Sequence, residues 1–225
     1  MFHVKQKKDF LRTFALKAKI PIAEDQLNQL MEYAESIAQW NQRVHLISKN
    51  DVDFVVERHI LPSLFFVKII EEQTKDAKVR ILDLGTGAGL PGVVLSIVKP
   101  GWDVVLLDSN RKKTLFLRRI KTDLKLNCEV VCERYEKYAP RESGEFDWLV
   151  ARAVAPLGEL VRLVSGHLKK GAKLLTIKGL DFAEELKGDE QKNFNLKFWP
   201  LKEMVNDNND YLENKCMVSV EKIYG

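Results

Sequence analysis

The sequence predicts an α/β protein with a mostly parallel sheet, because short apolar segments alternate with amphipathic helices over most of its length. A glycine-rich turn, DLGTGAGLPG, follows the first apolar segment and precedes a helix. At the carboxyl end, two strand-like segments follow each other without a helical pattern between them. Continuous apolar strands joined by crossover helices are typical of parallel sheets that are covered on both faces.

The amino-terminal part predicts a helical extension in front of the sheet. Its apolar residues recur at helical spacing, and Leu27, Leu30 and Met31 begin one such face. A polar segment, EEQTKDAK, separates this region from the first strand-like run. The predicted units are a helical extension over 1–70, a linker over 71–78 and a sheet domain over 79–225.

The sheet domain predicts strands and helices in strict alternation until its last third. The expected strands are 79–84, 103–108, 129–134, 146–152 and 173–178. The expected helices are 90–98, 111–126, 156–168 and 181–190. The segments NLKFWPLKEM and KCMVSVEKI then predict an antiparallel hairpin at the sheet edge, joined through the polar NDNND. Together these segments predict a sheet of seven strands.

Composition narrows the class of function. The 225 residues are 45% hydrophobic and 30% charged, an ordinary globular balance. The net charge of +4 permits nucleic acid as a partner without requiring it, so an RNA-binding role must show as a local patch. Cys128, Cys132 and Cys216 form neither an even disulfide set nor a CxxC pair, and no metal site is predicted. Without a secretory signal or a bilayer-long apolar run, a soluble cytoplasmic protein is expected.

The turn after the first strand is the expected ligand site, because ligands of open α/β sheets bind beyond the carboxyl ends of the strands. Gly85, Gly87 and Gly89 permit positive φ and leave room for a ligand against the backbone. The match of GAGLPG to G-x-G-x-x-G, with Asp108 about twenty residues on, suits a nicotinamide dinucleotide and an oxidoreductase. The register DLGTGAG instead puts Asp83 before the first glycine, which favours a cationic ligand such as S-adenosylmethionine. Asp108 suits both ribose hydroxyls in either case.

Six segments together resemble one protein family. They are QWNQRVHLIS, ERHILPSL, DLGTGAGLPGVVLSIVKP, LLDSNRKKTLFLRRI, FDWLVARAVAPL and LLTIKG, in this order within residues 24–180. The chain is thus similar to the bacterial small-subunit ribosomal RNA guanine-N-7 methyltransferases, historically called the glucose-inhibited division protein B family. This resemblance implies a class I, Rossmann-like fold and S-adenosylmethionine as cofactor. It also implies methyl transfer to N-7 of one guanine in small-subunit ribosomal RNA.

The resemblance also assigns residues to the cofactor. These are Gly85, Leu90, Tyr135, Glu136 and Arg152. Two positions depart from the family pattern, because His45 stands where an asparagine is expected and Pro62 where an aspartate is expected. Both fall in the helical extension, so they concern contacts with the substrate more than with the cofactor.

Methylation at N-7 sets modest chemical demands. N-7 carries an in-plane lone pair and no hydrogen, so no general base is needed, and alignment of the reactants can supply about 7–11 kcal/mol of barrier reduction. An arginine bound to both O-6 and N-7 would block the attacking atom. We therefore expect Arg152 to be the catalytic residue, holding O-6 alone, a phosphate or the carboxylate of the cofactor.

Basic residues predict where RNA binds. The helix RKKTLFLRRIKTDLK concentrates cations, with Asp123 as its one acidic residue. A second cluster consists of Lys5, Lys7, Lys8, Arg12, Lys17 and Lys19. The predicted RNA contacts are Arg58, His59, Arg111, Arg134 and Lys178. Cations of this kind would mainly bind phosphates of the RNA. The alternative for each of them is a position on a solvent-exposed helix face without any contact to RNA.

The expected partner is small-subunit ribosomal RNA or the small-subunit particle, bound by a monomer without membrane contact. The deep, narrow major groove of A-form RNA hides N-7, so the target guanine must lie in a loop, a bulge or an incompletely assembled region. A non-catalytic RNA-binding module on the same fold is the remaining alternative.

Overall fold

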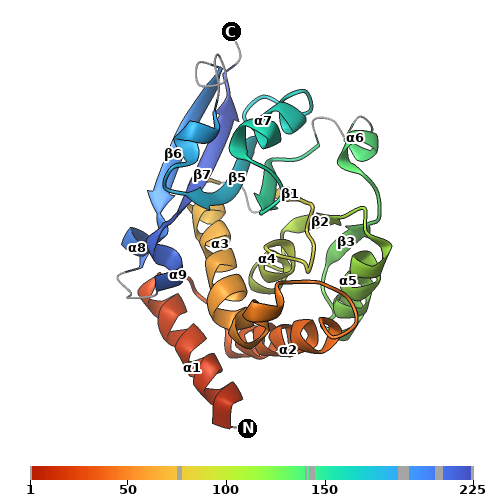
Figure 1. Cartoon of the computed structure of the whole chain (residues 1–225), viewed down its shortest axis with the longest axis vertical. Helices are drawn as coiled ribbons and strands as arrows, with labels where there is room; N and C mark the ends of the chain where they lie inside the picture. Colours follow the sequence, from red (N-terminus) through yellow and green to blue (C-terminus); the bar gives the residue numbers. More distant parts are fainter. Residues whose placement is uncertain are drawn as a thin grey trace.

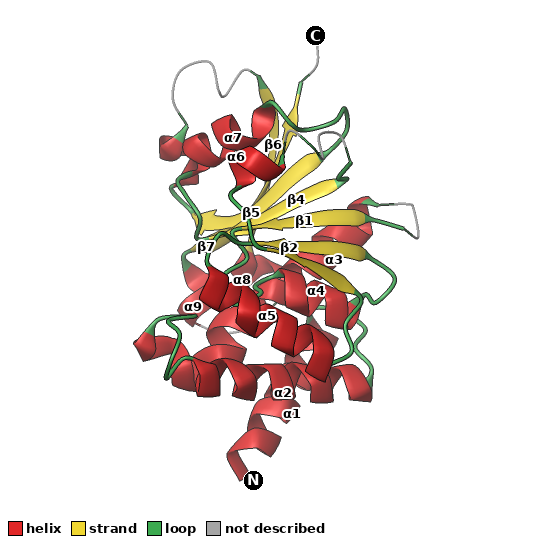
Figure 2. Cartoon of the chain, turned by 90° about the vertical axis from the view of Figure 1, so that its right-hand side faces the viewer, coloured by secondary structure: helices red, strands yellow, loops and turns green. Residues whose placement is uncertain are grey.

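The computed structural model describes residues 2–74, 78–139, 141, 145–186, 193–205 and 210–223. A central sheet lies between two unequal layers of helices, as Figures 1 and 2 show. The amino-terminal helices are α1 (Phe2–Lys17), α2 (Glu24–Trp40) and α3 (Leu61–Gln73), with the short helical turns η1 (Lys49–Phe54) and η2 (Val56–Ile60) between the last two. Helix α3 extends three residues into the segment that the sequence predicts as a linker.

The described residues form one seven-stranded sheet in the order β3-β2-β1-β4-β5-β7-β6. The strands are β1 (Arg80–Leu84), β2 (Asp103–Leu107), β3 (Cys128–Val131), β4 (Trp148–Arg152), β5 (Lys173–Gly179), β6 (Phe194–Pro200) and β7 (Lys215–Lys222). Strands β1 to β5 are parallel, and β7 runs antiparallel to both β5 and β6. This arrangement confirms the predicted mostly parallel sheet with its antiparallel hairpin.

The remaining helices connect these strands. They are α4 (Gly92–Val98), α5 (Arg111–Asp123), α6 (Tyr135–Tyr138), α7 (Leu157–Ser165), η3 (Phe182–Glu185), α8 (Leu201–Met204) and α9 (Asp210–Glu213). The helix predicted over 181–190 is represented by the single turn η3, and its last four residues lie outside the described part of the chain. Two one-turn helices, α8 and α9, stand in the connection of the hairpin. Helix α8 takes up the last four residues of NLKFWPLKEM, which the sequence predicts as strand, and α9 begins at the last residue of the predicted polar link NDNND.

Alternate residues of the strands face two different cores. Ile81 and Val150 point into the core that contains α1 to α5, whereas Leu82 and Leu149 point into the core beneath α6 and α7. The first core also contains Leu30 of α2, so the helical extension is packed directly onto the sheet. Figure 2 shows the extension and α4 and α5 on one face, with α6 and α7 on the other.

Helix α2 fixes the glycine turn from below. The hydroxyl of the fully buried Tyr33 donates a hydrogen bond of 2.7 Å to the carbonyl of Ala88, inside the turn. The amide of Gln26 donates to the carbonyls of Ile97 and Val98 at the end of α4, at 2.9 and 3.0 Å. The extension therefore holds both the turn and the helix that follows it. Among the described residues, no helix is both long enough and apolar enough to cross a membrane.

Candidate functional site

The strand order reverses between β1 and β4, and the turns that follow these strands meet there. In open α/β sheets this is the position of the ligand crevice. Three elements border it: the glycine turn after β1, the segment after β2 that begins with Asp108, and the segment after β4 that begins at Ala153.

The glycines of the turn serve different purposes. Gly85, Gly87 and Gly89 have φ values of 63°, 60° and 98°, in the region that disfavours other residues. A Cβ at Gly89 would lie 2.4 Å from a methyl carbon of Val93, so this glycine permits close packing within the protein. A Cβ at Gly87 would meet no atom closer than 3.8 Å. Gly87 is therefore the position where the backbone lies open to a ligand.

Asp83 lies beneath the glycine turn rather than in the open crevice. Its side chain is fully buried, and Oδ2 accepts hydrogen bonds from Thr86 Oγ1 at 2.5 Å and from the backbone N–H of Gly92 at 2.7 Å. The other oxygen, Oδ1, is buried and has no hydrogen-bond partner in the structure. Asp83 thus organises the turn, and the direct cofactor contact expected from the sequence remains a prediction.

Burial, together with a smaller effect of the charge of Asp108, raises the pKa of Asp83 to about 7, against the lowering effect of the hydrogen bonds from Thr86 and Gly92. Because this pKa exceeds that of an unfolded aspartate, the carboxyl group stabilises the fold most below about pH 4, and this contribution is lost as the pH rises towards 7.

Replacement of Asp83 by asparagine is expected to remove this pH dependence. The free energy of unfolding of the variant, measured by urea denaturation, should improve relative to the original protein as the pH rises from about 4 to about 7. A difference between the two proteins that stays constant over this range would contradict the assigned titration.

Asp108 lies directly after β2 and faces the glycine turn. Its Oδ2 accepts a hydrogen bond from the backbone N–H of Gly87 at 2.9 Å, and its Oδ1 accepts one from Asn110 N at 2.7 Å. The side chain is half-buried, so its carboxylate borders the open position at Gly87. Lys113 Nζ lies 4.0 Å from where a Cβ of Gly87 would be. Lys113 belongs to the basic helix that the sequence predicts, but its approach to Gly87 depends on the packing of α5 against the turn.

The segment after β4 covers the glycine turn from the other side. Ala153 has a φ of 53°, which turns the chain sharply, and a methyl carbon of Val154 lies 3.0 Å from where a Cβ of Gly85 would be. Lys178 Nζ donates a hydrogen bond of 2.6 Å to the carbonyl of Ala155 and pairs with Glu185 at 2.9 Å. The side chain of Lys178 is 11% exposed and supports this segment, and the RNA contact expected of Lys178 stays a prediction.

Arg152 extends from the end of β4 towards η2 in the extension. It lies on the same face of the strand as Trp148 and Val150, and its Nη1 and Nη2 donate to the carbonyls of His59 and Arg58 at 2.9 and 3.0 Å. Nη2 also contacts Nδ1 of His59. Among the described residues, no carboxylate lies within ion-pair distance of this guanidinium. Burial lowers the pKa of Arg152, against the raising effect of nearby tyrosines and of Asp51 and Asp83. The hydrogen-bond partners of this guanidinium are thus two backbone carbonyls and a histidine ring.

Two predicted RNA contacts lie within this network. His59 is 8% exposed, and its ring faces Arg152 and Asp51 instead of solvent. Arg58 pairs with Asp51 at 2.6 Å, and its guanidinium lies 4.3 Å above the ring of Phe54. Both side chains therefore have their nearest partners within the protein, and the direct RNA contacts expected of His59 and Arg58 stay predictions.

The segment after β3 contains Tyr135 and Glu136, at the beginning of α6. The side chain of Tyr135 is buried in the core beneath α7, with its ring centre 5.8 Å from that of His167. Burial raises the pKa of Tyr135. Its ring cannot stack on a ligand there, although the backbone of the segment remains at the edge of the sheet. Glu136 is exposed, and Leu90 is buried within the glycine turn.

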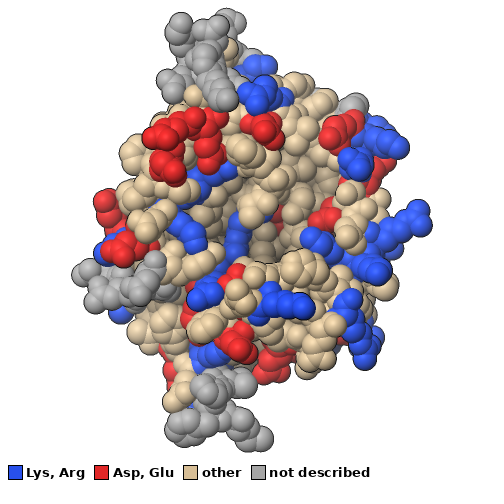
Figure 3. Space-filling view, in the orientation of Figure 1, with Lys and Arg blue, Asp and Glu red and all other residues tan. Residues whose placement is uncertain are grey.

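Basic side chains gather over α5, at the right of the view in Figure 3. Arg111, Lys112 and Arg118 are exposed there, whereas Arg119 pairs with Asp123. We call the first three residues the α5 patch. Arg134, before α6, is also exposed.

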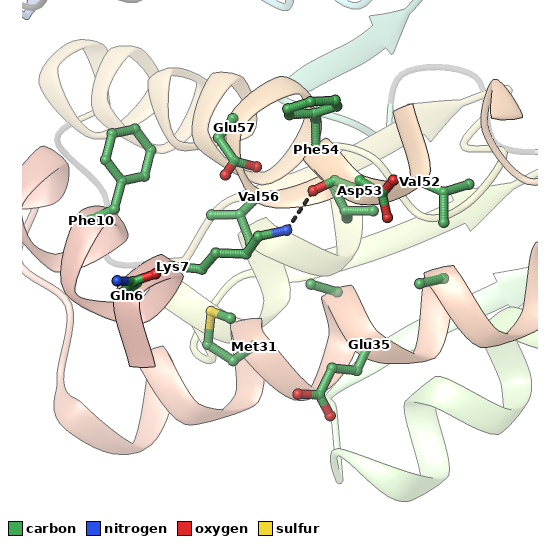
Figure 4. A pocket seen from close by; sticks show the side chains of 13 residues that line it. Gln6, Lys7, Phe10, Met31, Glu35, Val52, Asp53, Phe54, Val56 and Glu57 are labelled. Carbon is green, nitrogen blue, oxygen red and sulfur yellow. Dashed lines mark hydrogen bonds between the residues drawn. The ribbon is translucent and has the colours of Figure 1, made fainter. Parts of the chain in front are cut away.

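Two residues of the amino-terminal basic cluster form ion pairs within the protein. Lys8 and Arg12 both pair with Glu24, at 2.5 and 2.8 Å, and Arg12 also pairs with Asp9. Lys7 donates to the carbonyl of Asp53 across a cavity of about 730 Å³, which lies between α1, α2 and η1 (Figure 4). This cavity is separate from the crevice, because none of its lining residues belongs to the glycine turn, to Asp108 or to the segment after β4. The structure favours the α5 patch over this cluster.

The sequence matches one family over most of its length. Residues 26–209 match the family model described as rRNA small subunit methyltransferase G. A protein of Laribacter hongkongensis with the name Ribosomal RNA small subunit methyltransferase G is 37% identical over 158 residues, which are 70% of this chain and 72% of the relative. Proteins of the same name from Burkholderia vietnamiensis and Nitrosococcus oceani are each 38% identical, over 74% of this chain and 73% and 75% of the relatives.

Solved structures share the fold at low sequence identity. The crystal structure of MtNAS in complex with MTA and tNA aligns over 98% of this chain and 76% of the MtNAS chain, with a TM-score of 0.57 and 16% sequence identity. An rRNA methylase from Streptococcus thermophilus aligns with 72% of this chain and 97% of its own, with a TM-score of 0.51 and 15% identity. These likenesses confirm the Rossmann-like fold, and the sequence matches confirm the resemblance found in the motifs. The chain belongs to the rRNA small subunit methyltransferase G family.

Proposed function

We propose that this protein transfers a methyl group from S-adenosylmethionine to N-7 of a guanine in small-subunit ribosomal RNA. One observation supports this most strongly: in a chain of this family, the ends of neighbouring strands bring together an open glycine backbone, a carboxylate and an arginine that forms no ion pair within the described part of the structure. Gly87 offers the open backbone, Asp108 the carboxylate beside it, and Arg152 the cation at the end of the neighbouring strand.

These groups fit S-adenosylmethionine chemically. A carboxylate after β2 suits the two ribose hydroxyls, which donate hydrogen bonds, and Asp108 already accepts from the turn that would support the sugar. The absence of a Cβ at Gly87 leaves space for the ligand. Arg152 suits the carboxylate of the methionine part or O-6 of the guanine, because both are hydrogen-bond acceptors and arginine only donates. The backbone of Tyr135 and Glu136 remains a proposed cofactor contact.

Bound S-adenosylmethionine supplies a methyl group on a positively charged sulfur, and the N-7 lone pair displaces the sulfur in line, with no proton to remove. The protein's task is therefore to orient the two reactants rather than to act as an acid or a base. The extension fixes the glycine turn through Tyr33, and Asp83 fixes it from beneath through Thr86 and Gly92. These contacts place the crevice on rigid elements, as alignment of reacting atoms requires.

The RNA-binding role is proposed for the α5 patch together with Arg134, because these cations are exposed, and Arg111 and Arg134 follow shortly after the carboxyl ends of β2 and β3. In this proposal they anchor phosphates, while the guanine enters the crevice from an unpaired region of the RNA. Ribosomal RNA as substrate would place the reaction in the cytoplasm, and we propose a monomer as the acting form.

Removal of two cations from the α5 patch is expected to weaken RNA binding in a salt-dependent manner. The double variant Lys112→Ala/Arg118→Ala should lower the slope of log K against log salt by about 1.4–1.8, since each phosphate contact contributes about 0.7–0.9. The control Lys8→Ala/Arg12→Ala removes the same charge from residues that are paired with Glu24, and it should change the slope less. Equal changes in both variants, measured by titration of RNA at several salt concentrations, would contradict the assignment of the patch.

The proposed reaction is tested by supplying methyl-labelled S-adenosylmethionine with unmodified small-subunit RNA and, separately, with small-subunit particles. Mass spectrometry of nuclease fragments should locate the label on one guanine, as 7-methylguanine. Label on another base, or on another atom of guanine, would refute N-7 of guanine as the target. Absence of transfer to both substrates would refute the proposed activity.

A further inference from the structure

We propose that His59 is a positioning residue for Arg152, and that Asp51 sets the tautomer in which His59 does this. The inference rests on the proposed function, because it takes Arg152 to be the group that contacts cofactor or guanine. It differs from the sequence-based expectation, in which His59 contacts RNA.

The guanidinium of Arg152 is held by one short segment of the extension. The acceptors are two consecutive carbonyls, of Arg58 and His59, and the ring nitrogen Nδ1 of His59. The carbonyls belong to η2, whose hydrogen bonds span one residue more than those of an α-helix. The two ends of the contact lie 93 residues apart in sequence. The ring of His59 is the one side-chain acceptor among these three, so it is the part that a substitution can change without moving the backbone.

This contact requires one particular tautomer of His59. Arginine has donors only, so the Nδ1 that faces it must be unprotonated. The ring proton then lies on Nε2, which is buried and 3.3 Å from Oδ2 of Asp51. At this distance the ring nitrogen Nε2 and the carboxylate of Asp51 are in contact, although they are not aligned well enough to form a hydrogen bond. The second oxygen of Asp51 is held by Arg58 at 2.6 Å, which fixes the carboxylate in place.

The ring is also kept neutral. Burial, together with the positive charges of Arg152 and Lys215, lowers the pKa of His59 to about 4, against the raising effect of Asp51. A protonated ring would present a second donor to the guanidinium and would break the contact. The arrangement therefore uses Asp51 to orient the ring and uses burial to keep it uncharged.

Two nearly isosteric substitutions separate the two ring nitrogens. Asparagine at position 59 retains an acceptor close to the place of Nδ1 and loses the group that faces Asp51. Glutamine retains a polar group close to the place of Nε2 and loses the acceptor at Nδ1. His59→Asn should keep kcat for methyl transfer within about threefold, whereas His59→Gln should lower it about tenfold or more, the factor of one hydrogen bond to a charged group. The loss of kcat in His59→Gln should exceed what its change in melting temperature accounts for.

Other outcomes would overturn the inference. If kcat falls equally in both variants, in proportion to the change in melting temperature, His59 has only a structural role. If RNA affinity falls in both while kcat at saturating RNA is unchanged, His59 is an RNA contact as the sequence suggested.

A measurement without turnover keeps the inference separate from the proposed function. Nitrogen-15 NMR of the ligand-free protein at neutral pH should show a neutral His59 ring with Nδ1 unprotonated. A proton on Nδ1 would overturn the inference even if the protein methylates RNA. Conversely, a correct tautomer in a protein without methyl transfer would refute the proposed function and leave the Arg152–His59 contact in place.

Discussion

Replacement of Arg152 by alanine is expected to lower kcat/KM for methyl transfer by about a hundredfold or more while the protein remains folded. The variant loses the cation at the crevice, and removal of one preorganised donor from an active site costs on the order of 10²–10³ in rate. The free energy of unfolding should change by less than the activation free energy. The substitution removes the hydrogen bonds of Arg152, but it also removes a charge whose burial is unfavourable. Single-turnover kinetics and a thermal melt check the two parts separately.

A lysine at this position provides the matched control. Arg152→Lys keeps the positive charge, but its single ammonium group cannot reproduce the planar guanidinium that reaches the carbonyls of Arg58 and His59. Its activity should fall between those of the original protein and Arg152→Ala. Near-normal turnover in the alanine variant would show that Arg152 has no role in catalysis or cofactor binding.

Substitution of Gly89 by alanine is expected to destabilise the fold by about 2–5 kcal/mol. The backbone φ of 98° disfavours any side chain, and the new methyl group would meet Val93 at 2.4 Å and both Leu117 and Tyr33 Oη at 2.9 Å. Overpacking of this kind costs about 1–3 kcal/mol, and a left-handed conformation about 1–2 kcal/mol. Urea denaturation followed by circular dichroism measures the sum.

The same substitution at Gly87 is the control for packing. Its φ is 60°, but a Cβ would meet no atom closer than 3.8 Å, so only the conformational cost of about 1–2 kcal/mol applies. Gly87→Ala should instead weaken cofactor affinity, because the methyl group occupies the open side of the turn. If the two alanine variants lose equal stability, the distinct roles assigned to these glycines are wrong.

The strands and the glycine turn were predictable from the sequence because their signals are local. Ile81 and Leu82 lie in an apolar run bounded by a glycine cluster, and both are buried on opposite faces of β1 as such a run indicates. The α5 patch was also predictable from the sequence, because Arg111, Lys112 and Arg118 lie in one helical segment.

The roles of single polar residues were not predictable in the same way. His59 and Lys178 were expected at the RNA, yet they contact Arg152 and Ala155, residues 93 and 23 positions away. Tyr135 was expected at the cofactor, but the packing of α7 buries its ring. Periodicity states which face of an element is apolar, whereas the partner of a polar side chain depends on how distant elements pack. The ion pairs of Lys8 and Arg12 with Glu24 illustrate the same limit.

Calorimetric titration of the purified protein with S-adenosylhomocysteine, with NAD titrated in parallel, tests directly whether the glycine turn binds the methyl donor. We expect S-adenosylhomocysteine to bind at one site, Asp108→Asn to weaken this binding about tenfold or more through the loss of one charged acceptor, and NAD not to bind. Binding of NAD without binding of S-adenosylhomocysteine would refute the proposed cofactor site, and so would S-adenosylhomocysteine affinity that does not depend on Asp108.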